Sequence, residues 1–204
     1  MALKGKPKDK ISRRDGRNLY LKGARDFTKP GVVRRPTKPG QHGKTKRRLT
    51  TYGLQLREKQ AVKFMYLLGE KRFRRIFDMA LDIANKTGAP KGTTFLQLLE
   101  RMLFIVLYRA GLAKSKGAAR QLVVHGHVYV NGRRVKSPTY FVKEGDKIEV
   151  SLKVFEKYKP DYAHPGPAAW LDVKDNVCIV KRYPTREEIR QDIDESLVIA
   201  WYTR

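Results

Sequence analysis

The sequence predicts an α+β protein. It should have a mainly helical N-terminal domain with a basic extended arm, an inserted module of two helices on a small curled sheet, and a C-terminal helix. Three observations predict this architecture: apolar residues recur at helical spacing over residues 50–111, short β-branched runs flank an Asn-Gly turn, and Lys and Arg crowd residues 1–49. At 204 residues the chain can form one large domain or two modest ones with hydrophobic cores.

The basic arm, residues 1–49, is rich in Gly and Pro and has little hydrophobic periodicity. It holds 17 Lys and Arg against 3 Asp, a net charge of +14. Leu19, Tyr20, Leu21 and Phe27 supply apolar anchors that a purely solvated tail would lack. We therefore expect an arm that becomes ordered against a polyanion, with a disordered tail as the alternative.

The helical domain, residues 50–94, is expected to contain two amphipathic helices, over residues 51–68 and 70–85. Each has one apolar face. The opposite faces should carry the basic residues Arg57, Lys59 and Lys63 on the first helix, and Lys71, Arg72, Arg74 and Arg75 on the second. Like charges this close repel each other unless an anion lies beside them, although a solvated face is the plainer interpretation.

The inserted module, residues 95–150, should begin with a helix that runs to about Gly111 after a capping box formed by Thr94 and Gln97. Ser115 is a good N-cap for a second helix ending at His125, with Lys116 and Arg120 on its exposed side.

A hairpin and two further strands complete the module. The hairpin is centred on Asn131-Gly132, because a type I′ turn needs two residues with positive φ. Strands are expected near residues 140–142 and 147–150. Residues 151–184 extend the module with strands near 170–173 and 177–180. Residues 185–204 carry 3 Arg against 5 Asp and Glu, so a helix there should pack on protein and complete the helical domain.

The charge balance indicates the class of partner. With 45 Lys and Arg against 20 Asp and Glu, the net charge is +25 and the pI is near 10.3. Phosphate backbones relieve such self-repulsion and release counterions on binding, so nucleic acid is favoured over an anionic membrane or a basic protein without a polyanionic partner. The basic N-terminus is unlike a signal peptide and no apolar run approaches the ~20 residues of a membrane span, so we expect a cytoplasmic protein without membrane contact.

The sequence predicts no catalytic residues, no cofactor and no metal. Cys178 is the only cysteine, and the His125/His127 pair lacks nearby acidic or cysteine partners. The predicted site is instead a set of basic and polar side chains that bind folded RNA. These residues are Arg13, Arg14, Arg17, His42, Lys44, Lys46, Arg47, Arg48, Arg57, Lys59, Arg72, Arg74, Arg75, Lys114, Lys116, Arg120, Gln121, Asn131, Arg133 and Arg134.

Several short motifs resemble known proteins. Residues 95–150, through Ala119-Arg-Gln-Leu122 and Val130-Asn-Gly-Arg133, resemble the S4-type RNA-binding module, which also occurs in RNA-modifying enzymes and heat-shock proteins. More specific motifs lie outside it, and together they resemble the bacterial ribosomal protein S4 family over nearly the whole chain. They are Ser12-Arg-Arg-Asp-Gly16, Pro39-Gly-Gln-His-Gly43, Gln55-Leu-Arg-Glu-Lys-Gln60 and the C-terminal Leu197-Val-Ile-Ala-Trp-Tyr-Thr-Arg204.

This resemblance implies a structural protein of the small ribosomal subunit that binds 16S-type rRNA early in assembly of its 5′ domain. It also implies contact with the fifth small-subunit protein, a place beside the channel through which mRNA enters, and a role in translational accuracy. Two features depart from the family. The arm lacks the four zinc-binding cysteines of many relatives, and Met102-Leu103-Phe104 stands where relatives usually have Arg-Leu-Asp.

Two alternatives compete with the hypothesis of a structural ribosomal protein. An RNA-modifying enzyme would need a catalytic Asp in a Gly-Arg-Leu-Asp context and a large catalytic sheet, and the sequence offers neither. A peripheral ribosome-associated factor or a translational repressor is compatible with the RNA-binding chemistry, but the order of the motifs disfavours it.

Overall fold

The computed structural model describes residues 7–44, 48–157, 166–189 and 192–203. Within these residues the chain forms ten helices and five strands. In chain order they are α1 Lys8–Asp15, α2 Ala24–Thr28, α3 Gly31–Arg34, α4 Thr51–Met65, α5 Glu70–Thr87, α6 Lys91–Glu100, α7 Leu103–Arg109, α8 Lys116–Val124, β1 Val128–Val130, β2 Arg133–Arg134, β3 Lys147–Val150, α9 Leu152–Lys157, β4 Leu171–Lys174, β5 Val177–Val180 and α10 Glu195–Tyr202. The predicted α+β class is confirmed.

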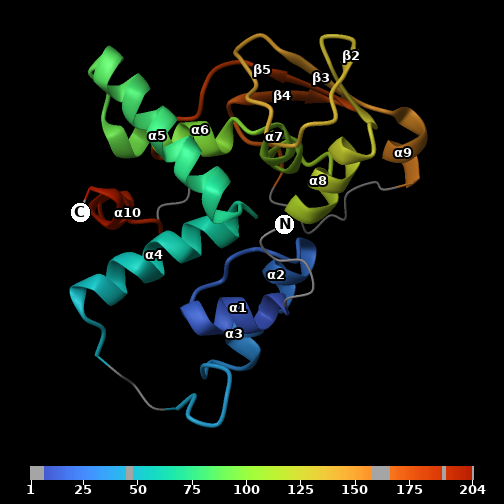
Figure 1. The fold of residues 1–204 in the computed structure, drawn as a ribbon. Coiled ribbons are helices and arrows are strands. Elements are labelled where there is room, and N and C mark those ends of the chain that lie inside the picture. The colour runs from blue at the N-terminus through green and yellow to red at the C-terminus, as the bar shows by residue number, and fades with distance from the viewer. Residues whose placement is uncertain (1–6, 45–47, 158–165, 190–191, 204) are drawn as a thin grey trace.

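The elements form three groups in space. Helices α4, α5, α6 and α10 lie together, the sheet lies beside them with α7 and α8 against it, and the short helices α1, α2 and α3 form a separate lobe next to α4 (Figure 1). The arm therefore contains three helices, which its composition did not predict. None of the described helices is both long enough and apolar enough to cross a bilayer.

The sheet has the order β2-β1-β3-β5-β4, and all its neighbouring strands are antiparallel. The Asn-Gly hairpin forms as predicted, with φ of 49° at Asn131 and 76° at Gly132. Strands near 147–150, 170–173 and 177–180 were also predicted correctly. The strand predicted at residues 140–142 is wrong, because this segment makes only an isolated bridge between Phe141 and Met102.

The single long helix predicted from Phe95 to Gly111 is also wrong. The chain breaks between α6 and α7, where the backbone N–H groups of Leu103 and Phe104 donate to the carbonyls of Tyr140 and Pro138 at 2.8 and 3.2 Å. The capping box at Thr94 is absent, since α6 begins earlier and the Thr94 hydroxyl donates to the Pro90 carbonyl at 3.0 Å. A tertiary contact therefore divides a continuous apolar pattern into two helices.

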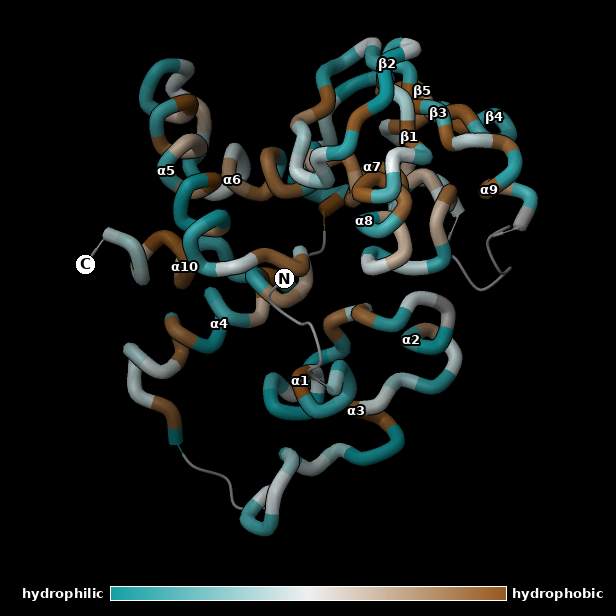
Figure 2. Tube along the Cα trace, turned by 45° about the vertical axis from the view of Figure 1, so that its right-hand side comes forward, coloured by the Kyte–Doolittle hydropathy of each residue, from teal (hydrophilic) through white to brown (hydrophobic). Residues whose placement is uncertain are grey.

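One hydrophobic core joins the helical group to the sheet. Every residue from Met102 to Leu107 is fully buried, and α7 appears as a mainly apolar segment between α6 and the sheet (Figure 2). The C-terminal helix packs on α4 and α6, and it approaches α6 so closely that a side chain at Gly92 would overlap Glu195. It spans Glu195–Tyr202, so the predicted start near residue 185 was too early.

Candidate nucleic-acid interface

Helix α5 presents a row of arginines to solvent. Phe73, Ile76 and Phe77 are at most 2% exposed, because their helical spacing turns them all toward the core. The same periodicity turns Arg72, Arg74 and Arg75 outward. All three are exposed and make no ion pair or hydrogen bond with the described residues, so their charges are available to an anion.

Helix α8 begins as the sequence predicts. The Ser115 hydroxyl accepts a hydrogen bond from the Ala118 N–H at 3.2 Å, and Gly126 follows the helix with a φ of 75°. Lys114, just before this helix, and Gln121, within it, are both exposed. The remaining N–H groups of the first turn and the helix dipole favour a negatively charged ligand here.

Two further basic residues lie close to the two ends of α8 and were not among the predicted site residues. Lys8 of α1 reaches the first turn of α8, because a Cβ placed on Gly117 would lie 3.8 Å from its Nζ. Lys136 lies close to Arg134, since both side chains approach Gly126. No local pattern could identify Lys8, which is more than 100 residues away in sequence, whereas continuing the basic run after Arg134 would have found Lys136.

A cavity of about 400 Å³ opens beside α8. Its polar lining comes from Lys114, Gln121, His125 and His127, and Leu122 and Val154 supply apolar surface. The two imidazole rings are stacked with their centroids 6.3 Å apart. Two predicted site residues, Lys114 and Gln121, are thus brought together in one hollow.

In the β1–β2 hairpin, one polar side chain holds the turn and two arginines are exposed to solvent. The Asn131 amide donates to Asp146 at 2.8 Å, and its side-chain oxygen accepts from the Lys147 N–H at 2.9 Å, so both ends of this side chain hold the turn. Arg133 and Arg134 are exposed. The Arg134 guanidinium lies 5.7 Å from the centre of the Tyr129 ring, which supports it without neutralising it.

Two lysines expected on exposed helix faces are instead buried. The prediction for Lys116 was wrong: its Nζ donates to the Met65 carbonyl at 2.9 Å and lies 5.5 Å from the centre of the Tyr66 ring. Lys59 is also buried, and its Nζ lies 2.7 Å from a Glu70 carboxylate oxygen and 4.9 Å from the centre of the Trp201 ring. Their assignment to RNA binding stays a prediction, and in this structure their amines bind protein.

Three predicted arginines of the arm and α4 form internal contacts. Arg17 pairs with Asp15 and Glu58, each at 2.7 Å, and donates to the Asp192 carbonyl at 2.6 Å. Burial lowers the pKa of Arg17, but the two carboxylates outweigh it and raise the pKa overall. Arg57 also pairs with Asp15, at 3.5 Å. Arg13 donates to the carbonyls of Arg35 and Thr37, so it holds the loop after α3.

The remaining predicted residues differ in their surroundings. Arg14, His42, Lys44 and Arg48 are exposed in the arm. Arg120 is only partly exposed and lies over the Phe104 ring, where burial lowers its pKa. Lys46 and Arg47 lie outside the described residues.

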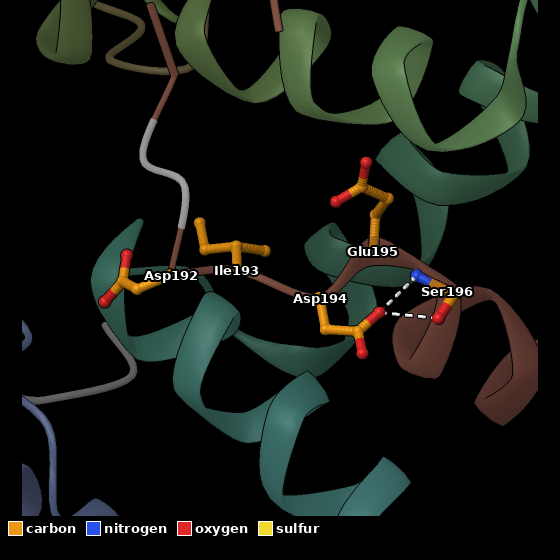
Figure 3. A pocket seen from close by; sticks show the side chains of 5 residues that line it. All are labelled: Asp192, Ile193, Asp194, Glu195 and Ser196. Carbon is orange, nitrogen blue, oxygen red and sulfur yellow. Dashed lines mark hydrogen bonds between the residues drawn. The ribbon is translucent and has the colours of Figure 1, made fainter. Parts of the chain in front are cut away.

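A second cavity, of about 460 Å³, lies at the start of α10 and is acidic. It is lined by Asp192, Ile193, Asp194, Glu195 and Ser196 (Figure 3). The Asp194 carboxylate accepts from the Ser196 N–H at 3.0 Å, and the hydrogen bond from the Ser196 side chain lowers its pKa. Carboxylates repel phosphates, so this lining disfavours contact with RNA. No three His, Cys, Asp or Glu side chains in the described ranges converge as metal ligands.

Comparison with known proteins matches two parts of the chain to family models. Residues 4–100 match the family model "Ribosomal protein S4/S9 N-terminal domain", and residues 103–148 match the model "S4 domain". The chain is 43% identical to small ribosomal subunit protein uS4 of Halothermothrix orenii and 45% identical to that of Caldicellulosiruptor bescii, each over 97% of both chains. That of Kosmotoga olearia is 44% identical over the same share. The chain therefore belongs to the small ribosomal subunit protein uS4 family.

Proposed function

We propose that this protein is a primary rRNA-binding protein that nucleates assembly of the 5′ domain of 16S-type rRNA. The observation that carries this proposal is the distribution of unpaired cations. Exposed arginines without acidic partners among the described residues lie on α1, α5 and the β1–β2 hairpin, three elements far apart in sequence. A folded RNA with several converging backbones can contact all of them at once.

The broader role follows from the family. As a uS4 protein the chain is a structural, rRNA-binding constituent of the small ribosomal subunit, acts in the cytoplasm and is not an enzyme. Its own side chains fit that role, because its exposed polar groups are dominated by Lys and Arg and its net charge is +25. Such groups bind phosphates electrostatically and catalyse no reaction.

Early assembly can be tested with purified components. The protein should bind a protein-free transcript of the 16S 5′ domain, and it should remain on small subunits washed in high salt. Binding only after other ribosomal proteins are added would contradict a nucleating role. Release from the subunit in the high-salt wash would favour the alternative of a peripheral ribosome-associated factor.

We also propose a second role, in guiding mRNA and thereby in translational accuracy. The exposed residues at the end of the arm support it. His42, Lys44 and Arg48 are exposed, and the two cations make no ion pair with the described residues. Flexible cations can hold phosphates of a moving strand without reading bases. A location beside the mRNA channel and contact with the fifth small-subunit protein are part of this proposal.

The double variant Lys46→Ala, Arg48→Ala tests mRNA guidance. Subunit assembly should stay near normal while ribosomes slow on structured mRNA. A severe assembly defect with normal unwinding by the assembled particles would assign this cluster to rRNA instead.

A further inference from the structure

Gly23 brings the basic arm into direct backbone contact with the S4 domain. It directly precedes α2, and its φ is +73°. A Cβ added to Gly23 would overlap the Lys114 carbonyl oxygen and would lie 3.0 Å from the Ser115 Cβ. Because the overlap is with backbone, no side-chain rotation relieves it. Only glycine therefore meets both the close approach and the positive φ without strain.

The segment before α2 holds this glycine in position. Leu19 and Leu21 are fully buried in the hydrophobic core that joins the helical group to the sheet. The Lys22 Nζ pairs with Asp9 of α1 at 2.6 Å, and the Lys22 N–H donates to the Asp26 carboxylate of α2. A displacement at the contact should therefore move the lobe of α1, α2 and α3 with it.

The start of α8 is the point where the three groups of elements meet. Besides the Gly23 contact, the Lys8 Nζ of α1 lies 3.8 Å from the position of a Cβ on Gly117. Lys116 of the same turn is buried and donates to the Met65 carbonyl at the end of α4, at 2.9 Å. In Figure 1 the lobe lies below this end of α8. This one turn therefore sets the position of the lobe relative to the other two groups.

We propose that Gly23 is a positioning residue that docks the lobe of α1, α2 and α3 onto the start of α8. Exposed cations of the lobe, such as Arg14, then keep a fixed spacing from those of the hairpin, Arg133 and Arg134. The phosphates of a folded RNA also lie at fixed positions, so a docked lobe avoids the ordering cost that a free arm incurs on binding. Gly23 acts through these cations and not by touching RNA itself. This inference rests on the proposed function for the identity of the RNA.

Gly23→Ala tests the contact against a control with the same backbone strain. Gly16 has a φ of +79°, but the nearest atom to an added Cβ is the end of the flexible Arg57 side chain, at 3.3 Å. Gly16→Ala therefore introduces the positive-φ strain without an overlap with backbone. Affinity for the 16S 5′-domain transcript should fall about tenfold in Gly23→Ala, because the docked fraction falls to about a tenth, and less than about twofold in Gly16→Ala. Equal losses in the two variants, or no loss in Gly23→Ala, would overturn the proposal.

Directed cleavage of the RNA shows whether the lobe has moved, which affinity alone does not. Cys178 is fully buried, so a cysteine introduced at an exposed position can be labelled selectively with an iron chelate that cleaves nearby RNA. With the probe at Lys29→Cys, directly after α2, Gly23→Ala should shift or scatter the cleaved positions. With the probe at Lys136→Cys, in the S4 domain, the cleaved positions should stay the same. An unchanged pattern from Lys29→Cys would overturn the proposal, and so would an equal shift from both probes, which would give Gly23 a general role in folding.

If Gly23→Ala fails to fold, the original protein still decides the question. Bound to the transcript, it should show a nuclear Overhauser effect between the Gly23 Hα and Ser115 Hβ protons, because the contact brings these groups together. Absence of this signal would overturn the proposal. Failure of the original protein to bind the transcript would contradict the proposed function and this inference with it, whereas binding without the Gly23 contact would contradict this inference alone.

Discussion

Arg17 shows how one cation in a basic arm can serve folding. It joins three segments, because its guanidinium contacts Asp15 in α1, Glu58 in α4 and the Asp192 carbonyl just before α10. Glu58 in turn accepts from the Asp194 N–H at 3.1 Å, so the network continues to the start of the last helix. Arg14, three residues earlier, is exposed and has no such contacts.

We expect Arg17→Ala to lower the free energy of unfolding by about 2–3 kcal/mol, because it leaves the buried Glu58 carboxylate without its cation and leaves Asp15 with only the longer ion pair to Arg57. Arg14→Ala, the matched control, should change it by less than about 0.5 kcal/mol. Urea denaturation of both variants measures the difference. Equal stability of the two variants would show that the Arg17 network contributes nothing to folding.

Glu70 makes stability depend on pH in the acid range. Burial raises the pKa of its carboxyl, but hydrogen bonds from Lys59 and Lys63 outweigh burial and bring it to about 2. The folded pKa is thus below the unfolded value of about 4.5. Its contribution to stability is therefore complete above pH 4.5 and is lost as the pH falls toward 2.

Glu70→Gln should accordingly flatten the loss of stability between pH 4.5 and 2, because the variant has no carboxylate there to protonate. Unfolding free energies measured across this range test the effect. Glu156→Gln, at an exposed carboxylate without an ion-pair partner, serves as the control. A variant whose acid-range curve matches that of the original protein would exclude Glu70 as the cause.

Elements defined by local chemistry could be predicted from the sequence. The cap at Ser115, the glycine after α8 and the Asn-Gly turn each depend on neighbouring residues alone, and all three are present. The break between α6 and α7 depends on the carbonyls of residues 138 and 140, so no pattern of neighbouring residues predicts it. The burial of Lys116 is similar, because its acceptor Met65 is 51 residues away. Helical periodicity alone did not identify this cation as a buried one.

In the hairpin, Gly132 should be needed for folding and Arg133 for RNA binding. Gly132 has a φ of +76° and no atom within 4 Å of an added Cβ, so only backbone strain opposes a side chain there. Gly132→Val should destabilise the protein by about 1–3 kcal/mol, because a β-branched residue is strained at positive φ. Arg133→Ala should leave stability unchanged and weaken binding to rRNA. Thermal unfolding and filter-binding assays on both variants test this, and equal losses of stability would contradict it.

The whole molecule distributes its charge unevenly. Unpaired cations occur on α1, α5, α8 and the hairpin, whereas the segment before α10 is acidic and pairs its arginines internally, as in Arg186 with Glu195 at 2.8 Å and Arg182 with Glu188 at 2.5 Å. Charge counts over sequence windows predicted this contrast between the two ends. They could not show which cations of the basic segments are neutralised in the fold, since Arg17 and Lys59 meet their acids only through tertiary packing.

Affinity for the 16S 5′-domain transcript should therefore fall steeply as salt rises, because each phosphate contact releases counterions and adds about 0.7–0.9 to the log–log slope. Replacing Arg72, Arg74 and Arg75 by Gln together removes three unpaired cations from α5 and should lower that slope by about 2.1–2.7. Arg182→Gln is the matched control, because its charge is already neutralised by Glu188, and it should leave the slope unchanged. A nearly salt-independent affinity, or an equal loss of slope in the triple variant and in Arg182→Gln, would mean that the exposed arginines of α5 do not contact the RNA backbone.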